Sequence, residues 1–124
     1  MSGNKILIVD DELDVLTVLG ARLSKSGYSV IKADNGKDAL IMAKKEHPDL
    51  ILLDIMMPDC DGGIVAQNLK NDPVTKDIPV IFLTCLVTKD EEAKVGHAIA
   101  GNFFIAKPYD PEKLLSEIKI HLLR

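Results

Sequence analysis

Short apolar runs alternate along this chain with segments of helical periodicity, and this alternation is the feature that most constrains its fold. The five runs that predict β-strands are Lys5–Val9, Tyr28–Ala33, Leu50–Leu53, Ile78–Leu83 and Phe103–Ala106. Pro79 moves the expected start of the fourth strand to about Val80, because proline cannot donate a hydrogen bond to a sheet. Continuous apolar runs are typical of strands that are buried on both faces, so the sequence predicts an α/β fold with a parallel sheet covered by helices.

Five helices are expected between and after these strands. The first follows the spacing of Leu13, Leu16, Leu19 and Leu23 and stops at Ser26-Gly27. The others run from Asn35-Gly36 to a stop before His47-Pro48, from the loop that ends at Gly63 to about Leu69, from near Asp90 to Ala100, and from Asp110-Pro111 along the stripe Leu114, Leu115, Ile118 and Leu122. The polar stretch Asn71–Asp77 predicts a loop.

Length and composition narrow the class of protein. A chain of 124 residues has the size of one domain, so residues 1–124 are expected to form a single one. With 15 basic residues against 19 acidic ones the net charge is −4, which argues against direct nucleic-acid binding. No apolar run approaches the roughly 20 residues of a membrane helix, and the N-terminus lacks the features of a signal peptide. Two cysteines make no disulfide framework, so a cytoplasmic location is expected.

The candidate functional side chains come directly after the first, third, fourth and fifth expected strands. Asp10 and Asp11 come after the first, Asp54 after the third, Thr84 after the fourth and Lys107 after the fifth. Taken singly, each has a simpler interpretation as a helix cap, a turn residue, a strand-end hydroxyl or a solvated lysine. Together they converge on the edge where open α/β sheets bind ligands. Three crowded carboxylates repel one another, and a hard cation such as Mg²⁺ offsets that repulsion and attracts a phosphate.

Four segments carry a resemblance to a known family. They are Asp10-Asp11, residues 53–62 (LDIMMPDCDG), residues 79–84 (PVIFLT) and residues 104–108 (FIAKP). In order and spacing they resemble the receiver domains of response regulators in two-component signalling, over essentially the whole chain. The resemblance implies a flavodoxin-like, doubly wound sheet of five parallel strands in the order 2-1-3-4-5, with five helices. It also implies a phosphoprotein that accepts a phosphoryl group in a phosphorelay.

The resemblance assigns a role to each residue of the constellation. Asp54 is the phosphoacceptor, and Lys107 and Thr84 contact the phosphoryl group. Mg²⁺ is held by the carboxylates of Asp11 and Asp54 and by the backbone carbonyl of Met56, with Asp10 acting mainly through water. Thr84 and Phe104 form the switch. Phe104 lacks the hydroxyl of the commoner tyrosine, which puts in doubt only the part of the switch that a hydroxyl would mediate.

The implied activity is limited to self-catalysed phosphorylation and dephosphorylation of the aspartate, so the chain is not expected to be a conventional enzyme. The implied partners are a histidine kinase or histidine phosphotransfer protein and, downstream, a protein target or a fused output domain. A phosphorylation-dependent dimer is also allowed, whereas nucleic acid and membrane are not expected. On the first helix, Val15, Val18 and Arg22 are expected to face away from the core and to meet the kinase. On the last helix, Ile120 is expected to lie opposite Ile118.

Three alternatives remain at this point. A phosphatase of the haloacid-dehalogenase type also uses an aspartate nucleophile and Mg²⁺, but it needs a second aspartate where this chain has Met56. A flavodoxin-like cofactor carrier would need a phosphate-cradling first loop, and Asp10-Asp11-Glu12 would repel a phosphate. A degenerate receiver that binds partners without phosphorylation is the third. Whether the chain acts alone or within a longer protein stays open.

Overall fold

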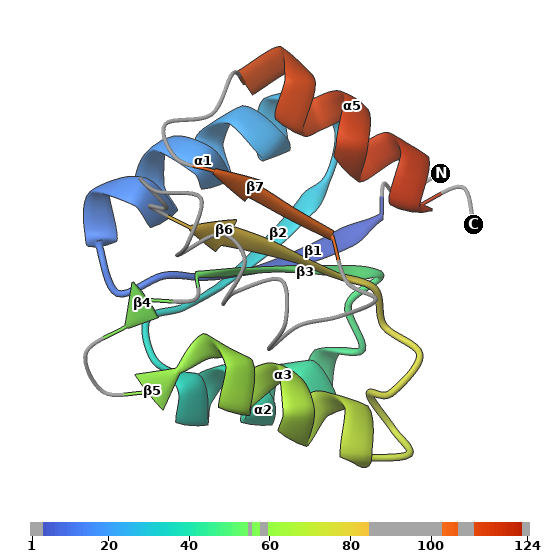
Figure 1. Cartoon of the computed structure of the whole chain (residues 1–124). Helices are drawn as coiled ribbons and strands as arrows, with labels where there is room; N and C mark the ends of the chain where they lie inside the picture. The colour runs from blue at the N-terminus through green and yellow to red at the C-terminus, as the bar shows by residue number, and fades with distance from the viewer. Residues whose placement is uncertain (1–3, 55, 58–59, 85–102, 107–110, 123–124) are drawn as a thin grey trace.

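The computed structural model describes residues 4–54, 56–57, 60–84, 103–106 and 111–122, and its centre is a five-stranded parallel sheet (Figure 1). The strands of this sheet are β1 (Lys5–Val9), β2 (Ser29–Ala33), β3 (Leu50–Asp54), β6 (Val80–Thr84) and β7 (Phe103–Ala106). Their order is β2-β1-β3-β6-β7, and every neighbouring pair is parallel. In order of appearance this is 2-1-3-4-5, so the predicted topology is confirmed. Strand β6 starts at Val80, as Pro79 led us to expect.

Helices cover both faces of the sheet (Figure 1). On one face lie α1 (Leu13–Lys25) and α5 (Pro111–Leu122), and on the other lie α2 (Gly36–Glu46) and α3 (Gly62–Asn71).

The predicted end of the third helix at about Leu69 was two residues short of its observed end at Asn71. The helix expected near residues 90–100 and the expected cap Asp110 lie outside the described residues. None of the described helices is long and apolar enough to cross a membrane.

Alternate residues of the central strands build two cores, one on each face of the sheet. Leu7, Leu53 and Phe82 belong to the core under α2 and α3, whereas Ile8 and Leu52 belong to the core under α1 and α5. All five side chains are fully buried. Side chains on a strand alternate between faces, so a strand with an apolar residue at every position must be covered on both sides. This burial explains the continuous apolar runs in the sequence.

The outer helices show the expected division into a buried and an exposed face. Leu16, Leu19 and Leu23 of α1 are buried, whereas Val18 is 66% exposed. Leu13 shares the helical spacing of the buried leucines, yet it is also 66% exposed because it lies in the first turn, beyond the edge of the core. The same division holds on α5: Leu114 and Ile118 are buried, Leu115 and Leu122 are partly buried, and Ile120 is exposed. The predicted orientations of Val18 and Ile120 are confirmed.

A surface ion pair joins the end of α2 to the turn after α3. Lys44 Nζ lies 2.8 Å from Asp72 Oδ2, and the backbone amide of Val74 donates to Asp72 Oδ1 at 2.9 Å. Both contacts favour the ionised carboxylate, with the Lys44 hydrogen bond the larger cause, and they hold the pKa of Asp72 below its ordinary value of 3.8. The pair therefore stabilises the fold at neutral pH.

This ion pair predicts a small pH-dependent contribution to stability. Because the folded-state pKa is the lower one, the contribution is complete above pH 3.8 and is lost as the pH falls through the folded-state value. Asp72→Asn should lower the midpoint of urea unfolding at pH 7, and its deficit against the wild type should shrink in more acidic solution. Lys44→Met should behave in the same way. A deficit that stays constant down to strongly acidic pH would contradict this assignment.

Candidate functional site

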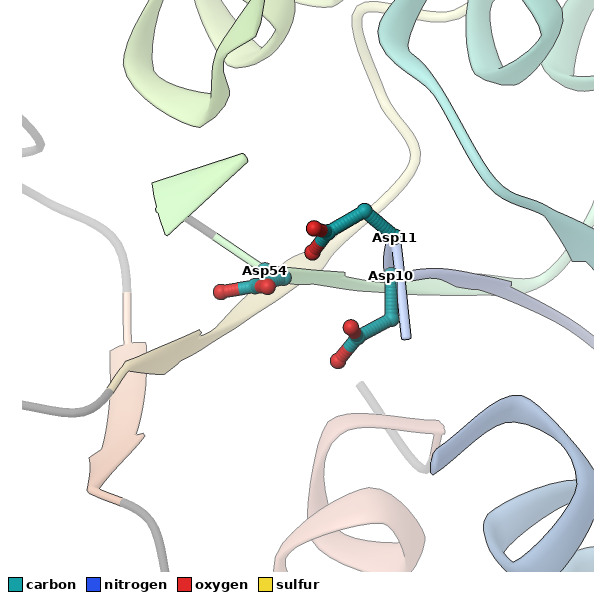
Figure 2. Close-up of side chains that lie close together, drawn as sticks. All are labelled: Asp10, Asp11 and Asp54. Atoms are coloured by element: carbon teal, nitrogen blue, oxygen red, sulfur yellow. The ribbon is translucent and has the colours of Figure 1, made fainter. Parts of the chain in front are cut away.

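Three carboxylates gather at the carboxyl edge of the sheet, where β1 and β3 end (Figure 2). Val9 pairs with Leu53 in the parallel register of these strands, so the residues that come next, Asp10 and Asp54, lie side by side. One carboxylate oxygen from each of Asp10, Asp11 and Asp54 lies within 4.8 Å of the others. The convergence expected from the sequence is therefore present in the structure.

The three carboxylates of this acidic cluster differ in their exposure to solvent. Asp10 is fully buried and Asp54 is 3% exposed, whereas Asp11 is exposed. Asp54 is the last residue of the central strand β3, and its backbone pairs with Leu83 of the neighbouring strand β6. A small molecule or ion that reaches the cluster thus meets Asp11 at the surface and finds Asp10 and Asp54 set more deeply.

Asp10 is fixed by hydrogen bonds of both its backbone and its side chain. Its backbone amide donates to the carbonyl oxygen of Ala33 at the end of β2, at 3.1 Å. Its carboxylate oxygen Oδ1 accepts a hydrogen bond from the backbone amide of Glu12, at 2.9 Å. An aspartate that binds the amide two residues ahead forms a compact turn. This turn leads from β1 into α1 and carries Asp11 at its centre.

The backbone also brings other predicted residues to this edge. Thr84 ends β6 and pairs with Ala106 of β7, one position beyond the pair formed by Leu83 and Asp54. Phe104 lies in β7 opposite Phe82. Met56 lies in β4 (Met56–Met57), a short strand that pairs antiparallel with β5 (Cys60–Asp61) directly after β3. Lys107 lies outside the described residues, so its approach to the cluster stays a prediction.

The donor set of the acidic cluster suits a hard divalent cation. Its ligands are carboxylate oxygens alone, with no sulfur or imidazole among the three grouped residues. Such oxygens are the ligands that Mg²⁺ and Ca²⁺ prefer. Two of the three side chains are withdrawn from water, which leaves their mutual repulsion poorly screened by solvent. A bound cation would remove that cost, and the residues therefore fit a metal site.

Two features of this site were missed by the sequence reasoning. The first is the short antiparallel pair β4–β5 after Asp54, which the sequence presents only as a loop rich in turn residues. The second is the unequal exposure of the adjacent Asp10 and Asp11. A signal for the hydrogen bond of Asp10 was present, because Asp10 lies three residues before Leu13, the first position of α1, and aspartate near a helix start often binds a backbone amide. The burial of Asp10 had no such signal.

Comparisons with known proteins agree with this geometry. A profile of the response regulator receiver domain matches residues 6–119. "Probable transcriptional regulator ycf27" of Porphyridium aerugineum is 40% identical over 124 residues, and the match takes in the whole of this chain but 50% of that protein. This chain therefore spans about half the length of the curated relatives it matches.

Solved structures show the same relationship. The signal receiver domain of a signal transduction histidine kinase from Syntrophus aciditrophicus has a TM-score of 0.87 at 33% identity, with 98% of this chain and 91% of that one covered. The receiver domain of sensor histidine kinase PA1611 from Pseudomonas aeruginosa PAO1, solved with a magnesium ion in its active site cleft, has a TM-score of 0.88 at 25% identity, with 99% and 100% covered. These matches set aside the phosphatase and the cofactor-carrier alternatives. The chain belongs to the response regulator receiver domains.

Proposed function

We propose that this receiver domain accepts a phosphoryl group on Asp54 with the help of Mg²⁺. The observation that carries the proposal is the acidic cluster, in which Asp54 is the carboxylate at the end of the central strand β3, beside Asp10 and Asp11. Asp11 and Asp54 would bind the cation through their carboxylates and Met56 through its backbone carbonyl, while Asp10 would act mainly through water. Magnesium would neutralise charge on the phosphoryl oxygens.

The chemistry asks little of the side chains beyond position and charge. A carboxylate oxygen of Asp54 attacks phosphorus, the new O–P bond forms, and the bond from phosphorus to the donor's leaving atom breaks. A carboxylate is already ionised near neutral pH, so no general base is needed. Lys107 and Thr84 would each contact a phosphoryl oxygen, which stabilises the charge that spreads over these oxygens during transfer.

The test is phosphorylation by a small donor. Purified protein incubated with acetyl phosphate and Mg²⁺ should gain the mass of one phosphoryl group, and the label should be released by hydroxylamine, as an acyl phosphate is. Chelation of the metal by EDTA should prevent the gain. Protein that stays unlabelled with Mg²⁺ present would instead favour the degenerate receiver, which binds its partners without phosphorylation.

The proposed donor in the cell is a histidine kinase or a histidine phosphotransfer protein that docks on α1. Val18 supports this, because it exposes 66% of its surface on the helix that starts beside the acidic cluster. Val18→Asp should slow phosphotransfer from such a kinase at least about fivefold, the scale of a contact worth about 1 kcal/mol. Labelling by acetyl phosphate should not change.

A matched control for the docking face is available on the opposite side of the sheet. Ile41 of α2 is 52% exposed, and Ile41→Asp should leave both rates unchanged. If Val18→Asp slowed labelling by acetyl phosphate as much as transfer from the kinase, the effect would lie in the site or the fold and the docking assignment would fail.

Phosphorylation is further proposed to act on a switch formed by Thr84 and Phe104. These residues lie on the neighbouring strands β6 and β7, whose ends reach the edge where Asp54 lies. Movement of Thr84 toward the phosphoryl group would free space for Phe104 and shift a pre-existing equilibrium between two surfaces. Thr84→Ala should still accept phosphate but lose the accompanying amide shifts in β6, β7 and α5. Identical shift changes in variant and wild type would contradict the switch.

The output of this switch is proposed to be a contact with a protein target or with an output domain in the same chain. A relative named as a transcriptional regulator is twice as long as this chain, so nucleic-acid binding by a longer protein would be compatible with the match. The absence of direct nucleic-acid binding by the receiver domain stays a prediction from its net charge of −4. Cytoplasmic location and a phosphorylation-dependent dimer, for which Ile120 offers an exposed apolar side chain, stay predictions as well.

A further inference from the structure

The carboxylate of Asp10 takes part in two arrangements at once. One of its oxygens lies within 4.8 Å of carboxylate oxygens of Asp11 and Asp54, which makes it part of the acidic cluster. Its Oδ1 atom also accepts the backbone N–H of Glu12, at 2.9 Å, at the start of α1. Figure 2 shows Asp10 and Asp11 projecting from the end of β1 toward the side on which Asp54 lies. Whatever fixes this carboxylate therefore affects both the cluster and the helix start.

The start of α1 relies on this contact for its geometry. Glu12 is the residue before the first helical position, and its own side chain makes no capping hydrogen bond. Amides at the beginning of a helix lack partners within the helix and need an acceptor from outside it. A carboxylate is a strong acceptor, because hydrogen bonds to a charged group are roughly twice as strong as neutral ones. The Asp10 carboxylate supplies such an acceptor from the preceding strand.

The other end of the same turn is fixed to the sheet. The backbone amide of Asp10 donates to the carbonyl oxygen of Ala33 at 3.1 Å, so the turn cannot shift as a rigid unit without breaking the connection to β2. Asp11 lies between the two anchored residues, Asp10 and Glu12. The conformation of the turn consequently decides where the exposed carboxylate of Asp11 stands relative to Asp54.

We propose that Asp10 is a positioning residue that couples cation binding at the acidic cluster to the first turn of α1. The inference rests on the proposed function, because it takes Mg²⁺ as the cation. A carboxylate has two oxygens and can accept an N–H while it faces a cation or its bound water. Since both partners hold the group in one orientation, each strengthens the other, and this linkage is reciprocal. Leu13, which is 66% exposed, follows Glu12 directly, so the coupling reaches the exposed first turn of α1, the helix proposed to meet the kinase.

Amide hydrogen exchange at Glu12 measures this coupling directly, in the whole chain and without any phosphorylation. Addition of Mg²⁺ to the wild type should slow exchange of the Glu12 amide at least about threefold. Without metal, Asp10→Ala should speed that exchange about fivefold, the effect of losing one hydrogen bond. Asp10→Asn, which retains an oxygen acceptor, should stay within about twofold of the wild type. Its Mg²⁺ affinity should fall between those of the wild type and Asp10→Ala.

Asp11→Asn is the matched control for loss of charge in the cluster. It should weaken Mg²⁺ binding and leave the metal-free exchange of Glu12 unchanged, because the Asp10 contact remains. Equal Mg²⁺ affinities of Asp10→Asn and Asp10→Ala would mean that Asp10 acts through its charge alone, and the proposal would be overturned. If Asp10→Ala does not fold, the wild type still decides: a Glu12 amide indifferent to saturating Mg²⁺ excludes the coupling.

Failure of this inference can be told apart from failure of the proposed function. Wild-type protein that is labelled by acetyl phosphate but shows no response of Glu12 to Mg²⁺ would reject the coupling and keep the phosphorylation. Protein that shows the Glu12 response but stays unlabelled would reject phosphorylation of Asp54 and keep the coupling.

Discussion

Asp54→Asn should abolish phosphorylation by acetyl phosphate while leaving the protein folded. The substitution keeps the shape of the side chain and an oxygen atom at the end of β3, but an amide is a far poorer nucleophile than a carboxylate. Asp10 and Asp11 remain as acidic neighbours in this variant. Any labelling that depended only on a crowded acidic site would therefore persist, whereas labelling of Asp54 itself would be lost.

The chain offers a close control for this experiment. Asp34 follows the parallel strand β2, so it also lies at a carboxyl end of the sheet, but it is not part of the acidic cluster. Its carboxylate is exposed and accepts a hydrogen bond from the side chain of Asn35. Asp34→Asn should be labelled at the wild-type rate. Intact-mass measurement of the three proteins is sufficient, and equal labelling of wild type and Asp54→Asn would disprove the assignment of the phosphoacceptor.

Removal of Mg²⁺ should markedly lower the thermal stability of the wild type. A ligand that binds only the folded state at 100 times its dissociation constant stabilises it by about 2.7 kcal/mol. For a domain of this size that corresponds to a rise in Tm of about 10 °C. The physical source is the relief of repulsion among three carboxylates, two of which are almost completely withdrawn from water.

The controls for this second effect separate specific binding from screening. Salt alone weakens repulsion between charges, so NaCl at equal ionic strength must accompany each Mg²⁺ concentration. Asp11→Asn should lose most of the Mg²⁺-dependent rise in Tm, and Asp34→Asn should retain it. A rise of the same size in Asp11→Asn, measured by thermal unfolding, would mean that Mg²⁺ acts at another place and would remove the support for a metal site in the acidic cluster.

The strands could be predicted because burial on both faces leaves a strong mark in the sequence, whereas their order along the sheet was implied by the resemblance to receiver domains. A strand covered on both sides is apolar along its buried length, as in Leu50–Leu53, and β3 becomes polar only at Asp54, where it reaches the carboxyl edge of the sheet. The starts of β6 and α2 could also be predicted, because Pro79 and Asn35 each set a boundary through their own backbone or side chain. The side-chain oxygen Oδ1 of Asn35 accepts a hydrogen bond from the backbone amide of Asp38, at 2.8 Å. The end of α3 was less predictable, because Leu69 is the last apolar residue of its periodic pattern and the polar residues that follow it do not show whether the helix continues.

The sequence by itself determined which residues could meet at the carboxyl edge, because parallel strands that end in Asp10-Asp11, Asp54 and Thr84 must bring those ends together. Only the tertiary structure decided how unequal they are. Asp10 and Asp11 are adjacent and chemically identical, yet Asp10 is buried against the Glu12 amide and Asp11 faces solvent. Burial and hydrogen bonding depend on how α1 packs on the sheet, and that packing sums contacts from residues far apart in the chain, which no local pattern encodes.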